Sequence, residues 1–311
     1  MLFSTVVAAL GLASSAHAWG QLGHKTVANV ALQFLQPGVR DTLTAILAAD
    51  GHNRLPNPSI VDVATWADGF SHSPEGTWTK GFHYIDAKDD PPLRCDVDLS
   101  RDCRGPGGCV VTAIANYTDQ LIHPSRNVDE TAQALKFVVH FLGDITQPLH
   151  TENFMHGGNG INVKWHGKKA KLHGVWDTGM IAEFFGSDNA TGLDSWTKRI
   201  VNEIKNGSYK DAVPEWLSCS DINDAVNCAT QWAVDTNKLI CDFVLKTTFH
   251  KNEELPKSYY DDAIPIIQRQ VAKGGVRLAS WLNQIFGTAE PGSLSLYEQD
   301  RLVLQLSEVE F

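Results

Sequence analysis

The sequence lacks an excess of positive charge. Its 311 residues contain 26 Lys and Arg against 36 Asp and Glu, which gives a formal net charge of -10. Proteins that hold nucleic acid through their own surface normally carry a basic patch or stripe, so this composition argues against a basic footprint. An anionic substrate held through bound cations is still compatible with it, because metal ions can outweigh the carboxylates around them.

Long apolar runs, internal repeats and low-complexity linkers are also missing after residue 18. No later run reaches the roughly 20 residues that a membrane-spanning helix needs, so we expect no membrane insertion. Alternation of strands and helices is absent, which argues against a parallel-sheet α/β fold. The remaining chain is long enough to bury one substantial core.

The first 18 residues have the features of a secretory signal peptide. The apolar run Leu2 to Leu12 is followed by the cleavage pattern Ala16-His17-Ala18, although no Lys or Arg precedes the run. We therefore expect removal of residues 1–18, a mature chain that begins at Trp19, and secretion to the extracellular space.

The six cysteines fit an oxidising compartment. Cys103 and Cys109 flank a Gly/Pro-rich stretch and are placed to close a local loop, whereas several pairings are open to the other four, Cys95, Cys219, Cys228 and Cys241. Three sequons allow N-glycosylation in that compartment, at Asn116, Asn189 and Asn206.

Apolar residues recur mostly at helical spacing. This periodicity predicts a single, mainly α-helical (all-α) domain over residues 19–287 with long loops. The predicted helices cover 26–35, 39–49, 60–67, 110–122, 132–146, 175–185, 192–206, 227–246 and 259–286. Residues 70–109 are expected to be irregular, and the glycine-rich stretch 156–174 favours a small hairpin. Residues 288–311 are expected to form a loosely attached tail.

The densest group of reactive side chains lies in "FVVHFLGDITQPLH", residues 137–150. His140 and Asp144 are four residues apart and share one helix face, and His150 follows. His173 and Asp177 repeat the same spacing. One such pair arises easily by chance and is best interpreted as a solvated helix face. A second pair and a third histidine nearby favour a metal site.

Further residues of the same kind occur earlier in the chain. Asp68 ends "ATWAD", and His83 and Asp86 lie at alternating positions of "FHYID", which we expect to be extended. Zinc takes His nitrogen and Asp oxygen as ligands, usually four at a time. Eight candidates are too many for one zinc ion and suit a cluster with a bridging carboxylate: His24, Asp68, His83, His140, Asp144, His150, His173 and Asp177.

The amino terminus of the mature chain is a further candidate ligand. An α-amino group has an unperturbed pKa near ~8, far below that of a lysine amine, so a metal can deprotonate it at modest cost. The amine and carbonyl of Trp19 would form a chelate once the signal peptide is removed. The alternative is that Trp19 only packs its indole, and position alone does not decide between the two.

With these residues identified, the chain resembles the zinc-dependent single-strand-specific nucleases of fungi and plants. The resemblance covers residues 19 to about 287. It rests on several motifs in order, among them "WGQLGH", "TWAD", "FHYIDAKDDPP", "FVVHFLGDITQPLH", "GGNGINV" and "AKGGVRLASWLNQI". It implies a mainly α-helical fold shared with bacterial zinc phospholipase C.

The resemblance also implies three Zn²⁺ ions with assigned ligands. One ion would be held by Asp68, His83, His140 and Asp144. A second would be held by Trp19 through amine and carbonyl, by His24, and by Asp144 as the bridging carboxylate. The third would be held by His150, His173 and Asp177. Asp68 and Asp144 would be the catalytic residues, acting through the metals they hold and a bridging hydroxide.

The same resemblance suggests a nucleobase pocket, in which Tyr84 stacks on the base and Asp86 hydrogen-bonds its edge. It suggests the disulfides Cys95–Cys241 and Cys103–Cys109, which leaves Cys219 and Cys228 as an extra pair.

Two positions depart from the family pattern. Ser71 stands where relatives carry Arg or Lys near the scissile phosphate, and the adjacent His72 is a possible substitute. His156 stands where a small apolar pocket residue is expected, so the base preference can differ.

The activity that follows is hydrolysis of single-stranded DNA and RNA to 5′-phosphate products by a monomer, with 3′-nucleotidase activity on 3′-nucleotides. One alternative is a zinc phospholipase C-like phosphodiesterase, because ligands and fold would be shared. Another is a non-catalytic zinc-binding protein, which only the loss of the basic residue at position 71 supports.

Overall fold

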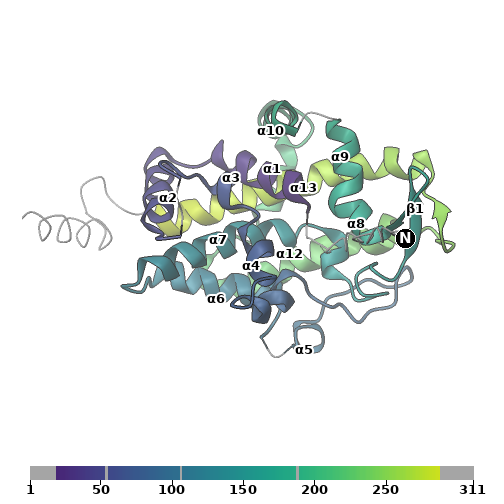
Figure 1. Ribbon diagram of the computed structural model, residues 1–311, viewed down its shortest axis with the longest axis horizontal. Coiled ribbons are helices and arrows are strands. Elements are labelled where there is room, and N and C mark those ends of the chain that lie inside the picture. The colour runs from purple at the N-terminus through teal and green to yellow at the C-terminus, as the bar shows by residue number, and fades with distance from the viewer. Residues whose placement is uncertain (1–18, 53–54, 106, 187–188, 288–311) are drawn as a thin grey trace, which may run out of the picture.

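The computed structural model describes residues 19–52, 55–105, 107–186 and 189–287. The expected signal peptide and C-terminal tail lie outside these residues. The described chain is mainly α-helical, as predicted, and several of its long helices run along the long axis of the molecule, with a small sheet at one end (Figure 1).

The core is built around helix α7 (Val128–Asp144). Asn127 caps it by accepting a hydrogen bond from the Asp129 amide, and every residue from Ala134 to Asp144 is buried. Apolar residues on all sides of a helix are typical of a helix that lies inside a domain. The last turn of α7 therefore carries His140 and Asp144 into the interior.

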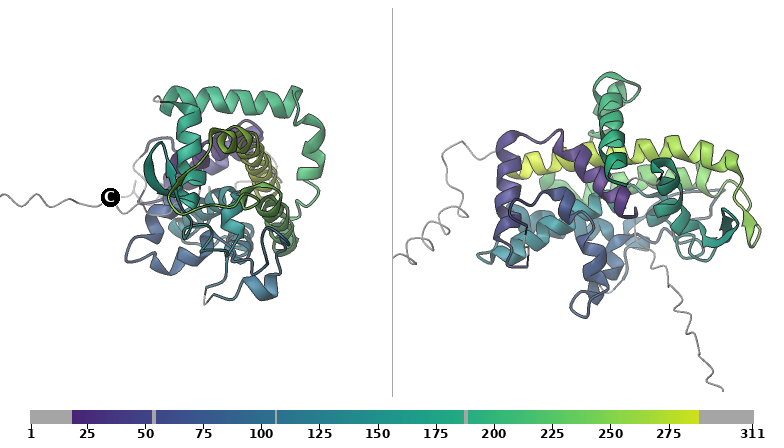
Figure 2. Two further views of the ribbon diagram at one scale, coloured as in Figure 1. Left: turned by 90° about the vertical axis from the view of Figure 1, so that its right-hand side faces the viewer. Right: turned by 45° about the horizontal axis from the view of Figure 1, so that its top comes forward.

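Helix α13 (Lys257–Phe286) packs on α1 (Gln21–Leu32) at very short range. A Cβ atom added at Gly275 would lie 2.4 Å from the Val30 side chain, so glycine is needed for this approach. Helix α10 (Asn189–Asn206) crosses outside α1 (Figure 2), and Asn29 donates a hydrogen bond to the Thr197 hydroxyl at 3.0 Å.

The remaining elements are mostly short. The α-helices are α2 (Pro37–Ala49), α3 (Ile60–Val63), α4 (Trp66–Ser71), α5 (Leu99–Asp102), α6 (Val110–Ile122), α8 (Leu172–Gly174), α9 (Met180–Phe185), α11 (Val213–Trp216) and α12 (Ala225–Leu239). Tighter or wider helical turns are η1 (Thr77–His83), η2 (Pro148–Thr151), η3 (Val175–Gly179), η4 (Lys210–Ala212), η5 (Ile222–Asp224) and η6 (Ile240–Val244).

Most predicted helices are present, with changed ends. The helix predicted over 110–122 has those bounds, whereas that predicted over 26–35 begins at Gln21 and includes His24. Glycines at 20 and 23 lower the helix propensity of this stretch, so the sequence did not indicate that the helix begins here. The helix predicted over 60–67 is divided into α3 and α4, and the irregular stretch 70–109 contains η1 and α5.

The predicted hairpin is present as β1 (Asn162–Trp165) and β2 (Lys168–Lys171), which pair antiparallel. His166 and Gly167 both have positive φ, as a two-residue type I′ turn requires. A third strand, β3 (Glu253–Glu254), pairs parallel to β1 and was not predicted. Two residues are too few for a strand pattern to be visible.

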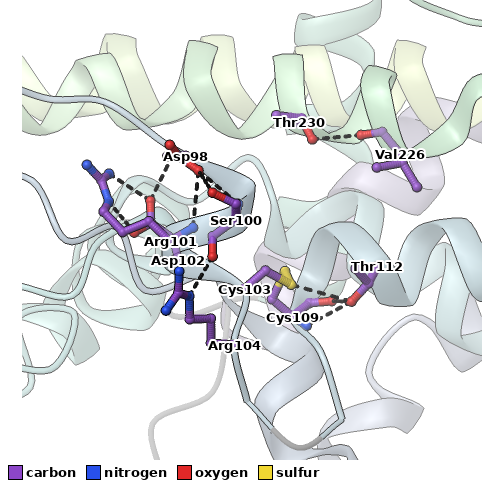
Figure 3. Close-up of a disulfide and its surroundings, with 10 residues drawn as sticks. All are labelled: Asp98, Ser100, Arg101, Asp102, Cys103, Arg104, Cys109, Thr112, Val226 and Thr230. Atoms are coloured by element: carbon purple, nitrogen blue, oxygen red, sulfur yellow. Dashed lines mark hydrogen bonds and ion pairs between the residues drawn. A yellow bond between two sulfur atoms is a disulfide. The ribbon is translucent and has the colours of Figure 1, made fainter.

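Three disulfides join the loops to the helices: Cys95–Cys241, Cys103–Cys109 and Cys219–Cys228. They are the expected pairs, including the extra one. Figure 3 shows that Cys103 and Cys109 lie between α5 and the start of α6, where the Thr112 hydroxyl accepts from the Cys109 amide. Arg101 of α5 binds the carboxylate of Asp102 beside them.

A buried ion pair joins α2 to α7. The Lys136 ammonium lies 2.6 Å from Asp50 and 4.3 Å from the ring centroid of Trp66. Burial alone would raise the pKa of Asp50, but the hydrogen bond and the charge of Lys136 bring it below its usual value. The stabilisation from this carboxylate is therefore present above about pH 4 and is lost as pH falls through the lowered folded-state pKa.

Asp50→Asn should destabilise the protein by about 3 kcal/mol at pH 7, because it leaves the buried Lys136 charge without a carboxylate. Urea unfolding at pH 7 and pH 3 would measure the loss, which should shrink at pH 3. Asp50→Asn/Lys136→Met, which removes both charges, should recover most of the stability. Equal stability of Asp50→Asn and wild type at pH 7 would contradict the prediction.

Candidate metal centre

The eight predicted ligand side chains lie together in the interior. They come from α1 (His24), α4 (Asp68), the end of η1 (His83), α7 (His140 and Asp144), η2 (His150), α8 (His173) and η3 (Asp177). All are buried; Asp68 and His83, each 7% exposed, are the most accessible of them. The centre therefore lies just below the surface and is nearest to solvent at Asp68 and His83.

Asp144 is at the middle of the first group. Its oxygens lie 3.2 Å from His24 Nε2, 3.0 Å from His83 Nδ1 and 3.3 Å from His140 Nε2. Asp68 Oδ1 lies 3.4 Å from His140 Nε2 and 3.8 Å from His83 Nδ1. One carboxylate thus faces three imidazoles, with Oδ1 towards His24 and Oδ2 towards His83 and His140.

A second group is formed by His150, His173 and Asp177. His173 Nε2 lies 3.2 Å from Asp177 Oδ2, and His150 Nε2 lies 4.0 Å from Asp177 Oδ1. The ligand-type atoms of the three residues all lie within 4.8 Å of one another. His150 Nδ1 is 3.9 Å from Asp144 Oδ1, so the two groups are neighbours.

Backbone carbonyls orient three of the imidazoles. The Nδ1 atoms of His140, His150 and His173 lie 2.7, 2.7 and 2.5 Å from the carbonyl oxygens of Ala64, His83 and Gly157. Donation from Nδ1 leaves the lone pair on Nε2, which faces the other ligand-type groups. Hydrogen bonds of this kind fix the tautomer of metal-binding histidines.

Local backbone features make this convergence possible. A Cβ atom at Gly143 would lie 2.7 Å from His24 Nδ1, so the glycine gives the imidazole of α1 room against α7. Asp177 lies in the wide turn η3, and π-type turns of this kind are frequent at functional sites. Gln147 donates to Asp177 Oδ1 at 2.6 Å and accepts from the Leu149 amide, which holds the carboxylate in place.

Burial controls the protonation of the centre. Burial, and then electrostatic interaction with one neighbouring histidine, lower the pKa of His24 (beside His140) to about 4 and that of His173 (beside His150) to about 3. Burial also lowers the pKa of His140, but Asp144 and Asp68 more than compensate and raise it well above its usual value. Burial raises the pKa of Asp177 well above its usual range.

The donor set fits bound cations. Among the described residues, five buried side-chain atoms of the centre make no hydrogen bond: His24 Nε2, His83 Nε2, Asp144 Oδ1, His150 Nε2 and Asp177 Oδ2. Leaving a buried polar atom unpaired costs about 1–3 kcal/mol, and native structures rarely do so without a reason. Nitrogen and carboxylate oxygen donors in this number are typical zinc ligands.

The indole of Trp19 is fully buried and donates to the Thr146 hydroxyl at 3.0 Å. The next amide, Gly20 N, donates to the Asp177 carbonyl at 2.7 Å. The start of the expected mature chain is therefore fixed against the two segments that carry Asp144 and Asp177. The indole therefore packs in the interior and anchors this end of the chain.

The predicted substrate residues lie beside the centre. Tyr84 follows His83 directly and is 41% exposed. Asp86 is half-buried, and burial raises its pKa while Lys88 and His156 partly offset this effect. Both residues lie on an extended segment, as expected, but His83 itself ends the η1 turn.

Ser71, at the position where relatives are expected to carry Arg or Lys, brings no positive charge to the centre. Its side chain is buried, and its hydroxyl donates to the Asp68 carbonyl at 2.9 Å. His72 is exposed, and its Nδ1 lies 2.8 Å from the same carbonyl. Both side chains thus contact the backbone of Asp68.

Several residues that shape the centre were not identified in the sequence: Gly143, Thr146, Gln147, and the carbonyls of Ala64 and Gly157. Gln147 lies inside the ligand-rich stretch, and its position between Asp144 and His150 was the one available signal. Gly143 and the two carbonyls act through close packing or backbone hydrogen bonds, which leave no residue-type pattern, and the Thr146 hydroxyl accepts from an indole that is distant in the sequence.

Fold and site together define an all-α protein with a buried His/Asp centre of the kind that holds metal ions. The family model for S1/P1 nuclease matches residues 19–287. The chain belongs to the S1/P1 nuclease family, as the sequence motifs predicted, and is therefore an enzyme of the nuclease class.

Its relatives span nearly the whole chain. Nuclease P1 of Penicillium citrinum is 40% identical over 272 residues, which cover 87% of this chain and 98% of that protein. Nuclease S1 of Aspergillus oryzae is 40% identical over 280 residues, 89% and 95% of the two chains. Endonuclease 4 of Arabidopsis thaliana is 31% identical over 299 residues, 92% and 95% of the two.

A solved structure of Clostridium perfringens alpha-toxin aligns with 90% of this chain and 67% of that one. Its TM-score is 0.42 at 13% identity, which is too low to carry an argument about activity.

Proposed function

We propose that the chain is a secreted, zinc-dependent endonuclease that hydrolyses single-stranded DNA and RNA to 5′-phosphate products and also acts on 3′-nucleotides. The observation that carries the proposal is the buried His/Asp centre, with its five atoms lacking hydrogen bonds, in a chain of the S1/P1 nuclease family. Family membership favours this activity over the phospholipase C-like alternative.

The proposed metal content is three Zn²⁺ ions, with the ligands assigned from the motifs. Asp68, His83, His140 and Asp144 would hold one ion. Trp19, His24 and the bridging Asp144 would hold the second, and His150, His173 and Asp177 the third. The short distances from Asp144 to three imidazoles support its bridging role, and the separate His150 group supports a third position.

When bound, zinc lowers the pKa of a coordinated water towards ~7 and so supplies a nucleophile near neutral pH. Asp68 and Asp144 act by holding the ions in place. The exposed Tyr84 ring would stack on one base, and Asp86 would hydrogen-bond its edge. Stacking of this kind tolerates any base but needs the base outside a duplex, which favours single strands.

The lack of a basic residue at position 71 changes which groups would stabilise the negative charge of the substrate phosphate. Ser71 contributes no positive charge, so stabilisation of the phosphate would depend on the metal ions, and the adjacent His72 is the candidate substitute. His156 interacts electrostatically with Asp86, and the resemblance to the family places it in the same pocket. We infer a base preference that differs from that of relatives with a small apolar residue there.

The proposed cellular form is a monomer of residues 19–287, with the tail beyond, secreted after loss of residues 1–18. The three disulfides support an oxidising compartment. Asn116 and Asn206 are exposed and accessible to glycosylation, whereas the side chain of Asn189 lies outside the described part. Within the described ranges, no helix has both the length and the apolar character needed to cross a membrane.

Metal removal is the direct test. Elemental analysis of the mature protein should give close to three zinc ions per chain, and EDTA should abolish cleavage of single-stranded DNA. Added zinc should restore cleavage, because the ligands are held in place by backbone hydrogen bonds. Full activity after complete metal removal would rule out the proposed function. Hydrolysis of phosphatidylcholine, but not of single-stranded DNA, would favour the phospholipase alternative.

A further inference from the structure

A groove of about 510 Å³ is lined in part by Pro91 and Pro92, which follow Asp86 of the proposed base pocket in the chain. Three segments form it: the loop around Pro91 and Pro92, the stretch 154–162, and residues 245–251 after η6. Nothing in the ligand set or the base pocket uses this groove. It is lined mainly by apolar side chains, with lysines from the third segment.

One wall presents apolar side chains to solvent. Phe154 is 47% exposed and Met155 is 48% exposed, although both are large and apolar. On the other side, Phe249 packs edge-on against the buried Tyr259, with ring centroids 5.7 Å apart, and so forms a fixed surface. Exposed aromatic rings that face a groove are the usual platforms for unpaired bases.

The wall that carries Phe154 is built from strained backbone. Four consecutive residues, Met155 to Gly158, have φ between 51° and 77°. Positive φ is costly for Met155 and His156, which have a Cβ atom, and such strain persists where surrounding structure enforces it, often at functional sites. Hydrogen bonds from Gly158 N to Phe154 O and from Gly160 N to Met155 O hold the turn.

This strained turn connects the groove to the catalytic centre. Gly157 O accepts from His173, a proposed zinc ligand, and the Asn153 amide donates to Ala87 O, one residue after Asp86. The segment that carries Asp86 and the turn that carries Phe154 are therefore joined directly by a backbone hydrogen bond. A strand bound through Tyr84 and Asp86 can continue along Phe154.

Two lysines provide charge for a phosphate backbone. Lys246 and Lys251 line the groove and are exposed, and neither forms an ion pair with a carboxylate in the described ranges. In a chain with a net charge of -10, two such lysines beside exposed aromatic and apolar side chains match a polyanion with bases.

We propose that this groove is a second nucleotide subsite that binds the part of a single-stranded polynucleotide flanking the cleaved bond. An unpaired base lies against Phe154 and Met155, and its phosphates lie beside Lys246 and Lys251. The inference rests on the proposed nuclease activity and adds where the enzyme binds substrates longer than one nucleotide. Mononucleotides fill the base pocket alone and do not reach the groove.

The test compares substrates of different length on the zinc-loaded enzyme. In Phe154→Ala/Lys246→Ala/Lys251→Ala, KM for a single-stranded decanucleotide should rise about tenfold or more, because a stacking contact and two phosphate contacts are lost. kcat/KM for adenosine 3′-phosphate should stay within about twofold of wild type. The slope of log KM against log salt should fall by about 1.4, since each single-strand phosphate contact contributes about 0.7.

The matched control is Lys198→Ala/Lys210→Ala, which removes two exposed lysines outside the groove and should leave KM unchanged for both substrates. An unchanged decanucleotide KM in the triple variant would overturn the proposal. An equal loss on both substrates would also overturn it, because the groove would then only support the centre. If wild type cleaves neither substrate, the proposed function itself has failed.

Discussion

Asp144→Asn should lower the turnover of single-stranded DNA by at least about a thousandfold and reduce the zinc content of the purified protein. The carboxylate lies within 3.3 Å of the ring nitrogens of His24, His83 and His140, so its loss removes charge from the position proposed to bridge two ions. Changes in residues that only support a ligand already cost ~10–100-fold in affinity or activity, and a bridging ligand should cost more.

The measurement is kcat together with elemental analysis on the same preparation, and thermal unfolding shows that the variant is folded. Asp119→Asn provides the control, because it replaces an exposed carboxylate on α6 by the same amide. It should match wild type in both zinc content and kcat. An Asp144→Asn protein with full zinc content and wild-type kcat would show that the centre is not catalytic.

A mature chain with one additional alanine before Trp19 should bind about one zinc ion fewer and lose most of its activity, by about a hundredfold or more. The reason is chemical: an amide nitrogen is a poor ligand, whereas a free α-amino group with a pKa near ~8 gives up its proton readily. The buried indole and the hydrogen bond from Gly20 N to Asp177 O fix this end of the chain, so it cannot rearrange freely.

In the matched control, the extension ends in a protease site directly before Trp19. Cleavage then frees the Trp19 amine and should restore both zinc content and activity in the same sample. The comparison separates the effect of the amine from any effect of expression. Equal zinc content and activity before and after cleavage would exclude the terminal amine as a ligand.

The ligand-bearing helices could largely be predicted from the sequence. The spacing of His140 and Asp144 places both on one helix face, and the apolar residues around them predict a buried helix, which α7 is. The prediction that ligands from seven elements converge came from the resemblance to a family. Spacing within one helix carries no information about residues on another. His150, His173 and Asp177 do group as that resemblance implied.

The details that complete the centre were not predictable. The partner of the Trp19 indole, Thr146, lies 127 residues away, and only tertiary packing brings them together. The glycine pair at 157–158 favoured a hairpin in the sequence, but in the structure it completes a left-handed turn that begins at Met155. Side chains other than glycine rarely adopt positive φ, so no propensity indicates such a turn.

Backbone carbonyls, and not side chains, accept the hydrogen bonds that orient His140, His150 and His173. A carbonyl oxygen is retained whatever side chain its residue carries, so replacement of Ala64 by another small residue leaves the hydrogen bond to His140 intact. Inserting or deleting one residue near position 64 or 157 would instead move the acceptor itself. The centre should therefore tolerate drift in the identity of these neighbours and resist changes in loop length.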